Sequence, residues 1–152
     1  MAKSETVIVS ADSSAGYVAD IIAGAKAMKI DESAVEEGHK TGPDPNDFIL
    51  SSLGACTVVT LHMYASRKNW PLERAEVRLQ HEYVTVQDPV QPEKQVKKML
   101  ITKQLILVGD LNEAQRQRLE EISGRCPVQR TLEAGVLVET YLDPALPFPD
   151  KL

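Results

Sequence analysis

The spacing of apolar residues along the chain predicts an alternation of strands and helices. Three short segments rich in Val, Ile, Tyr and Ala, at residues 5–11, 16–22 and 25–30, are typical of strands. Polar residues and glycines separate them, which favours an antiparallel meander. Residues 31–44 are polar and contain two glycines and a proline, so we expect a linker there.

The longest apolar segment follows this linker and is predicted to be a helix. Asp44 is a suitable N-cap, and Pro45 fits the first helical turn. Asp47 places a negative charge at the positive end of the helix dipole. We expect the helix to run to about Lys68, because residues 69–71, Asn-Trp-Pro, would stop it.

The apolar period then changes from that of a helix to that of a strand. Residues 74–86 alternate, which predicts a strand with one face in water. Ala75, Val77, Leu79 and Tyr83 are expected on one face, and Glu76, Arg78, Gln80 and Glu82 on the other. Gln87–Lys98 holds two prolines and several charges and is predicted to be a loop, and Met99–Val108 a second strand.

A capped helix is predicted after these strands. Asn112 is the expected N-cap, with Gln115 as its capping-box partner. Leu119 and Ile122 lie on the apolar side, and Gly124 ends the helix.

Two more elements complete the predicted order. Pro127–Ala134 is expected to form a short helix and Val136–Leu142 a last strand, before an irregular proline-rich tail. The order β-β-β-α-β-β-α-α-β over residues 1–152 predicts one α+β domain with antiparallel sheets. Its buried central helix needs cover on all sides, which makes a partner subunit plausible.

Charge excludes some classes of function. The formal net charge is −5, and acidic and basic residues are interspersed. This argues against a nucleic-acid binder and against binding to an anionic membrane surface. Phe48–Ser66 carries no Asp, Glu, Lys or Arg, but its Ser, Thr, Gly and His residues keep its hydrophobicity low, so we interpret it as a helix buried in protein.

The N-terminal sequence has no basic stretch followed by an apolar core, so no secretory signal is expected. We therefore expect a cytoplasmic protein. A reducing compartment disfavours a permanent disulfide between the two cysteines, Cys56 and Cys126, and still allows a transient catalytic one.

Cys126 lies where two helices are predicted to meet. If Gly124 ends one helix and Pro127 begins the next, Cys126 is the N-cap of the second, where free N–H groups favour a thiolate. Arg125 and Arg130 could add positive charge. The alternative is a cysteine that only packs.

Cys56 lies well inside the long helix, where burial alone would leave the thiol inert. It is either a small apolar residue or a reactive thiol whose cation comes from elsewhere in the fold. The three histidines, His39, His62 and His81, have no metal-site spacing with the cysteines. Lys94, Lys97, Lys98 and Lys103 are interpreted as a solvated face.

Two motifs resemble those of one known family. Residues 42–57, G-P-D-P-N-D-F-I-L-S-S-L-G-A-C-T, are similar to the central-helix motif of the OsmC/Ohr family. Residues 126–133, C-P-V-Q-R-T-L-E, resemble its second-cysteine motif. The two cysteines are 70 positions apart (126 − 56), and the predicted element order is also similar.

The resemblance implies an intertwined homodimer that reduces peroxides, above all organic hydroperoxides, without a metal or organic cofactor. Carried over, Cys56 matches the peroxidatic thiol and Cys126 the resolving thiol, although the residues alone favour Cys126 as the more activated. An external dithiol would reduce the resulting disulfide.

Two positions depart from the family pattern. Active members use an arginine from the N-terminal strands, and this chain has no arginine before Arg67. The family's glutamate after the helix-opening proline is here Asn46, and the nearest carboxylate is Asp47. We expect Arg130 to supply the cation, ahead of Arg125, Lys26 and Lys29, because a guanidinium keeps its charge when partly buried. The alternative function is a redox-sensitive binding or sensor protein with little turnover.

Overall fold

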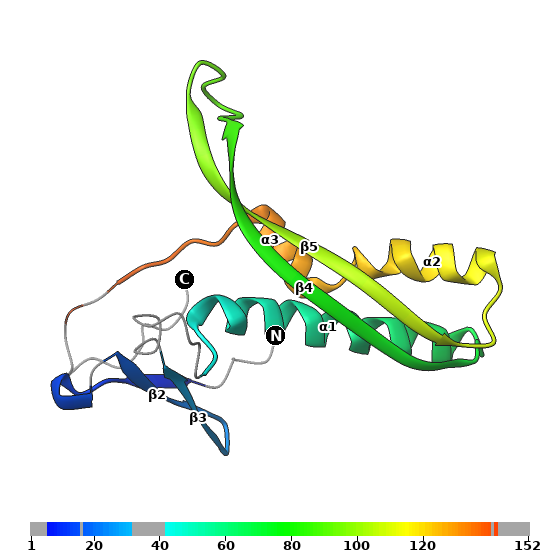
Figure 1. The fold of residues 1–152 in the computed structure, drawn as a ribbon, viewed down its shortest axis with the longest axis horizontal. Coiled ribbons are helices and arrows are strands. Elements are labelled where there is room, and N and C mark those ends of the chain that lie inside the picture. The colour runs from blue at the N-terminus through cyan, green and yellow to red at the C-terminus, as the bar shows by residue number, and fades with distance from the viewer. Residues whose placement is uncertain (1–5, 16, 32–41, 141, 143–152) are drawn as a thin grey trace.

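The computed structural model describes residues 6–15, 17–31, 42–140 and 142. Its elements are arranged around one long helix (Figure 1). In chain order they are β1 (Val7–Ser10), the 3-10 turn η1 (Ser13–Ala15), β2 (Val18–Ala23), β3 (Lys26–Asp31), α1 (Pro45–Arg67), β4 (Leu72–Gln87), β5 (Gln95–Gly109), α2 (Glu113–Ser123) and α3 (Pro127–Ala134). The predicted α+β class with antiparallel sheets is confirmed.

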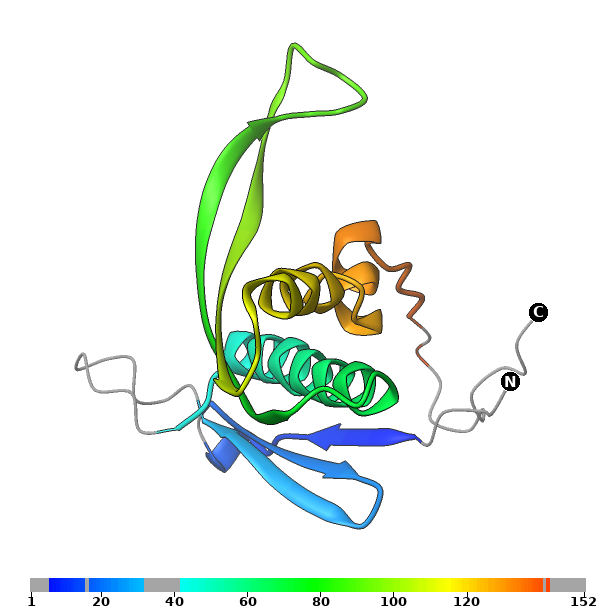
Figure 2. The same ribbon diagram turned by 90° about the vertical axis from the view of Figure 1, so that its right-hand side faces the viewer.

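The N-terminal strands form the predicted meander. β2 lies between β1 and β3 in a three-stranded antiparallel sheet, in which Ile21 pairs with Val9 on one side and Met28 on the other. Ile21 is the only buried hydrophobic residue of this sheet among the described residues. The sheet shares no backbone ladder with β4 and β5 and lies beside the start of α1 (Figures 1 and 2). Residues 32–41 of the predicted linker lie outside the described residues.

β4 and β5 form a long antiparallel ribbon, and α1, α2 and α3 lie on the same side of it (Figure 2). The loop predicted at Gln87–Lys98 is wrong at both ends, because Gln87 belongs to β4 and residues 95–98 belong to β5. Val86 pairs with Val96 there, so backbone pairing continues through a polar segment. Tyr83, expected on the inner face, is 61 % exposed.

α1 begins and ends where the sequence predicts. Asp44 and Asp47 form a reciprocal capping box, in which each side chain accepts a hydrogen bond of 2.9 Å from the other's backbone N–H. At the C-terminal end, Lys68 is the C-cap and Asn69 has a positive φ of 55°. These caps fix the register of α1, and therefore the position of the cysteine within it.

The hydrophobic core lies between the second half of α1, the base of the ribbon and α2. It consists of the buried residues Leu61, Ala65, Leu111, Leu119 and Ile122. α2 has the predicted capping box between Asn112 and Gln115. The predicted packing of Leu119 and Ile122 on its apolar side is confirmed, since both are buried.

The last predicted strand is wrong for the residues that can be judged. Residues 136–140 and Leu142 are not in a strand, and Tyr141 lies outside the described residues. Val136, Leu137 and Val138 are 68 %, 100 % and 81 % exposed. Their apolar side chains suit a strand, but a strand needs a neighbour whose backbone groups pair with its own.

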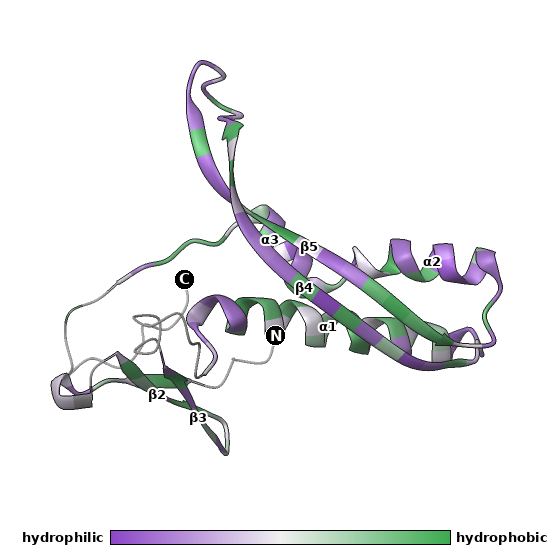
Figure 3. Cartoon of the chain, viewed as in Figure 1, coloured by the Kyte–Doolittle hydropathy of each residue, from purple (hydrophilic) through white to green (hydrophobic). Residues whose placement is uncertain are grey.

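One face of α1 is buried, and part of the opposite surface is exposed. Its buried residues Leu53, Thr57, Leu61 and Ala65 follow a spacing of four, whereas Val59 and Met63 are 56 % and 52 % exposed. The helix is long and apolar enough to cross a membrane by length and composition alone, and 33 % of its most apolar 18-residue window is buried. The N-terminal strands are also rich in apolar residues (Figure 3), and Val7, Ile8, Val9 and Ile22 among them are at least half exposed.

Candidate functional site

The fold brings the two cysteines together. Cys126 is the N-cap of α3, as predicted, and α3 packs against α1, which carries Cys56. The Cys56 side chain lies next to the Cys126 thiol and helps to lower its pKa, and both cysteines are free. Cys126 has no exposed surface and Cys56 is half-buried, so an incoming small molecule reaches Cys56 first.

Local structure fixes the Cys126 sulfur. Its Sγ accepts a hydrogen bond of 3.3 Å from the backbone N–H of Gln129, in the first turn of α3. The Thr57 hydroxyl, one residue along α1 from Cys56, lies 3.8 Å from the same sulfur and 2.8 Å from the Leu53 carbonyl oxygen. A hydroxyl has one proton, so Thr57 can donate to only one of these acceptors at a time.

These contacts favour a thiolate at Cys126. Burial raises the pKa of its thiol, but the N–H of Gln129, the side chains of Cys56 and Thr57, and the charge of Lys103 together bring the pKa below its usual value. This supports the expectation from its N-cap position that Cys126 is an activated thiol.

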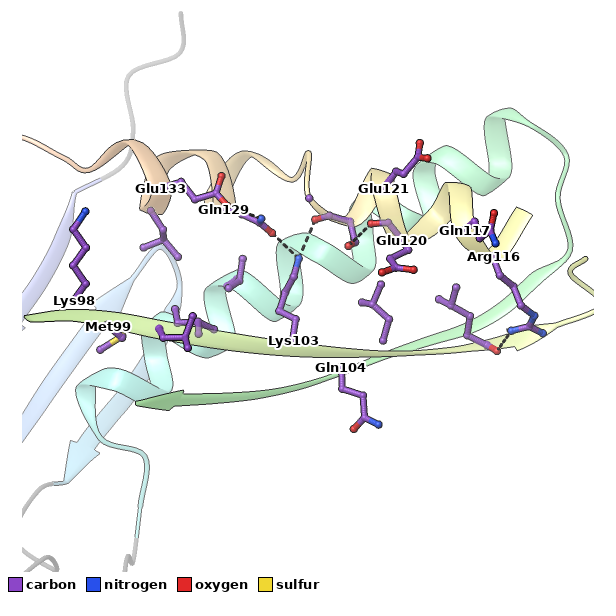
Figure 4. A pocket seen from close by; sticks show the side chains of 18 of the residues that line it. Lys98, Met99, Lys103, Gln104, Arg116, Gln117, Glu120, Glu121, Gln129 and Glu133 are labelled. Atoms are coloured by element: carbon purple, nitrogen blue, oxygen red, sulfur yellow. Dashed lines mark hydrogen bonds between the residues drawn. The ribbon is translucent and has the colours of Figure 1, made fainter. Parts of the chain in front are cut away.

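Lys103 of β5 is the cation beside the thiols, and the sequence analysis missed it. Its Nζ donates hydrogen bonds to the Ser123 carbonyl oxygen at 3.0 Å and to Gln129 Oε1 at 2.6 Å. Burial lowers the pKa of Lys103, while the negative charges of Cys126, Glu133 and Cys56 counteract this lowering. Its side chain reaches from the ribbon towards the start of α3 (Figure 4).

The alternation of residues along β5 indicates that the Lys103 side chain points inward. Ile101, Lys103, Leu105 and Leu107 occupy every second position, and this series faces the helices. A lysine on the inner face of a strand needs a partner, whereas Lys94, Lys97 and Lys98 are exposed as expected. Treating all four lysines as one solvated face was wrong for Lys103.

The other predicted site residues have different surroundings. Asp47 is occupied in the capping box of α1, nine residues before Cys56, which is about 13 Å along a helix. Arg130 is exposed on α3, and its backbone N–H donates to the Cys126 carbonyl oxygen at 3.2 Å. Lys29 forms an ion pair with Asp20 in the N-terminal sheet. Direct roles for Asp47 and Arg130 in catalysis stay predictions.

The described histidines lie apart from the thiols' contacts. His62 is exposed on α1. His81 Nε2 lies 3.4 Å from Asn46 Nδ2. Asn46 is the residue that stands where the family described above has a glutamate. His39 lies outside the described residues. Within residues 6–15, 17–31, 42–140 and 142, no group of three or more His, Cys, Asp or Glu residues could hold a metal ion.

A comparison with family models decides the family. The model described as OsmC-like protein matches residues 38–141, a range that includes both cysteines. The chain belongs to the OsmC-like family. This confirms the resemblance seen in its two motifs. No curated protein matches the OsmC-like chain.

Solved structures share its fold at low sequence identity. An OsmC-like protein from Mycoplasma pneumoniae is 18 % identical, with a TM-score of 0.65 over 88 % of this chain and 89 % of that one. The organic hydroperoxide resistance protein OsmC of Legionella pneumophila is 18 % identical, with a TM-score of 0.54 over 83 % and 88 %. The organic hydroperoxide resistance protein OhrB of Bacillus subtilis is 17 % identical, with a TM-score of 0.52 over 82 % and 87 %.

Proposed function

We propose that this OsmC-like protein is a thiol-dependent peroxidase that reduces organic hydroperoxides through Cys56 and Cys126. The observation that carries the proposal is the contact of two free thiols, 70 positions apart, beside the ammonium group of Lys103. Two structural neighbours are organic hydroperoxide resistance proteins, which supports a role in oxidative stress defence.

The reaction begins at the more exposed sulfur. The Cys56 thiolate attacks the terminal peroxide oxygen, an S–O bond forms, and the O–O bond breaks. The alkoxide takes a proton and leaves as an alcohol, and Cys56 becomes a sulfenic acid. Because the two cysteine side chains interact, a proton can pass between the sulfurs, and the peroxide reacts at the sulfur that it can reach.

The second step uses the stabilised sulfur. The Cys126 thiolate attacks the Cys56 sulfenic sulfur, an S–S bond forms, and hydroxide leaves and is protonated to water. An external dithiol then reduces this disulfide by exchange and is itself oxidised. These steps use only the two cysteines, the peroxide and a dithiol, so no metal or organic cofactor takes part.

An apolar pocket beside the thiols favours an organic substrate. Its volume is about 510 Å³, and it lies between the N-terminal third of α1 and helix α3. It is lined by Phe48, Ile49, Ser52, Pro127, Val128, Thr131 and Leu132. Ser52 is one helical turn before Cys56, and Pro127 follows Cys126, so an alkyl group held here would present its hydroperoxide to the site.

The protein is proposed to act as a cytoplasmic homodimer that binds neither membrane nor nucleic acid. The unpaired apolar faces of α1 and of the N-terminal sheet support the dimer: Val59, Met63, Ile8 and Ile22 are each at least half exposed. A second copy that covers α1 would bury its apolar surface in protein and not in a membrane.

The test is the consumption of an organic hydroperoxide and of hydrogen peroxide with a dithiol reductant. We expect turnover with preference for the organic peroxide, and loss of turnover in Cys56→Ser. The competing function is a redox-sensitive binding or sensor protein, which Asn46 favours because it replaces the family's glutamate and contacts His81 instead. Stoichiometric oxidation of the thiols without turnover would support the sensor and contradict the peroxidase.

A further inference from the structure

Lys103 is held beside the thiols by two hydrogen bonds. Its strand, β5, presents it to a groove of about 1390 Å³ between the ribbon and helices α2 and α3 (Figure 4). The Ser123 carbonyl oxygen and Gln129 Oε1 each accept one of its N–H groups, at 3.0 Å and 2.6 Å. An ammonium group has three N–H donors, so one is left for a further acceptor.

Gln129 ties the ammonium group to the Cys126 sulfur. Its backbone N–H donates to Cys126 Sγ at 3.3 Å, while its side-chain oxygen accepts from Lys103. Its side-chain Nε2 donates to Glu133 Oε1 at 2.8 Å, one turn further along α3. The amide is therefore held from both ends, and one residue fixes both the sulfur and the cation.

Helix α1 brings Cys56 near the same lysine. Leu53 lines the groove with Lys103, and Cys56 follows Leu53 by three residues, about one turn. Leu79, the ladder partner of Lys103, packs against Gly54 of α1. The lysine thus lies where the ribbon, α1 and α3 meet.

We propose that Lys103 is the cation that stabilises the thiolate of the Cys56–Cys126 pair, positioned by Gln129, in the role that family members give to an arginine of the N-terminal strands. The part it plays in peroxide reduction rests on the proposed function. Its effect on the thiols does not, because that effect follows from charge and position alone.

Electrostatics agree with this geometry from both sides. The charge of Lys103 contributes to the lowered pKa of Cys126, and both thiols counteract the lowering that burial imposes on the pKa of Lys103. A half-buried ammonium group without an anion would tend to lose its proton. The thiolate and the lysine therefore keep each other charged.

The experiment is a titration of thiolate ultraviolet absorbance in a Cys56→Ser background, where Cys126 is the only thiol. Lys103→Met is expected to raise the apparent pKa of Cys126 by about one unit, the lower end of what a nearby opposite charge produces. Lys103→Arg should keep most of the lowering. Gln129→Leu retains the backbone donor but releases the lysine, so it should give an intermediate rise.

Two variants provide matched controls. Lys97→Met removes the same charge from an exposed position on the same strand and should leave the titration unchanged. Arg130→Met tests the arginine predicted from the sequence. A rise with Arg130→Met and none with Lys103→Met would overturn the proposal, as would equal rises with Lys97→Met and Lys103→Met.

The titration also separates this proposal from the proposed function. If wild type fails to turn over peroxide but Lys103→Met raises the thiol pKa, the function fails and the cation stands. If wild type turns over peroxide and adding Lys103→Met to Cys56→Ser leaves the thiol pKa unchanged, the cation fails and the function stands. Should Lys103→Met not fold by circular dichroism, Lys103→Arg and Gln129→Leu decide the matter by the same readout.

Discussion

Gly54 of α1 lies so close to Leu79 of β4 that a Cβ on the glycine would stand 3.0 Å from Leu79 Cδ1. Leu79 is the ladder partner of Lys103, and Gly54 comes two residues before Cys56. The contact therefore sets the distance between the helix that carries Cys56 and the ribbon whose second strand, β5, carries Lys103.

This contact predicts a graded response to side chains at residue 54. Gly54→Ala should be nearly neutral, because alanine favours the helix by about 1 kcal/mol while the flexible end of Leu79 shifts. Gly54→Val should lower the free energy of unfolding by about 1–3 kcal/mol through overpacking. It should also slow disulfide formation. Leu79→Ala in the same chain should recover part of the loss, and additive effects in denaturant unfolding would contradict a direct contact.

The second prediction concerns oxidation of the cysteines. Stoichiometric organic hydroperoxide should link Cys56 to Cys126, because the two side chains already interact. Non-reducing peptide mapping should find this crosslink, and non-reducing electrophoresis should keep the chain at monomer size. Cys126→Ser should instead leave Cys56 as a sulfenic or sulfinic acid. Two free thiols after excess peroxide would show that the pair is only structural.

The third prediction concerns the turn between β5 and α2. The Arg116 guanidinium donates to the carbonyl oxygens of Leu107, Gly109 and Leu111, at 2.9, 3.2 and 3.3 Å. Arg116→Leu should lower the free energy of unfolding by about 2 kcal/mol or more, because hydrogen bonds to a charged group are lost. Arg125→Leu, at an exposed position, is the control and should change stability little. Equal thermal shifts for the two variants would show that the three bonds add nothing.

The sequence predicted most of the fold because the signals that carried it are local. The N-cap of α1 at Asp44, the capping box of α2 and the N-cap position of Cys126 depend on neighbouring residues, and all three are confirmed. The far end of the ribbon was missed because backbone pairing of residues 95–98 with β4 does not depend on apolar side chains. The strand expected at Val136–Leu142 was wrong over its described residues because a strand requires a partner that composition does not reveal.

The site was predicted less completely, for the same physical reason. Motifs identified both cysteines, because each motif is a continuous stretch of sequence. Lys103 lies 47 positions from Cys56 and 23 from Cys126 (103 − 56 and 126 − 103), and only the ribbon brings it to them. The alternation along β5 distinguishes Lys103, which follows the inward-facing apolar residues, from the exposed lysines Lys94, Lys97 and Lys98.

The fourth prediction concerns the exposed face of α1. Static light scattering should give the mass of a dimer at micromolar concentration, because Val59 and Met63 are exposed in the single chain. Val59→Asp should shift the mass towards the monomer or cause aggregation. Glu93→Lys, in the exposed turn between β4 and β5, should not change the mass. A folded, stable monomer in the wild type would contradict the homodimer.

The last prediction is a dependence of stability on pH that arises from Cys126. Burial raises the pKa of its thiol in the folded protein, but the Gln129 N–H and the neighbouring side chains outweigh this effect. The pKa is therefore lower than in the unfolded chain, where a cysteine titrates near ~8.5. Between these two pKa values the unfolded chain binds more protons than the folded one, so the free energy of unfolding rises with pH. The stabilisation is fully present above the unfolded pKa and is lost as pH falls through the folded pKa. Denaturant unfolding in the presence of a reductant, from about pH 6 to about pH 10, should therefore show a rise that Cys126→Ser removes and Lys103→Met reduces. A rise of equal size in all three proteins would assign the effect to other groups and leave Cys126 as an ordinary buried thiol.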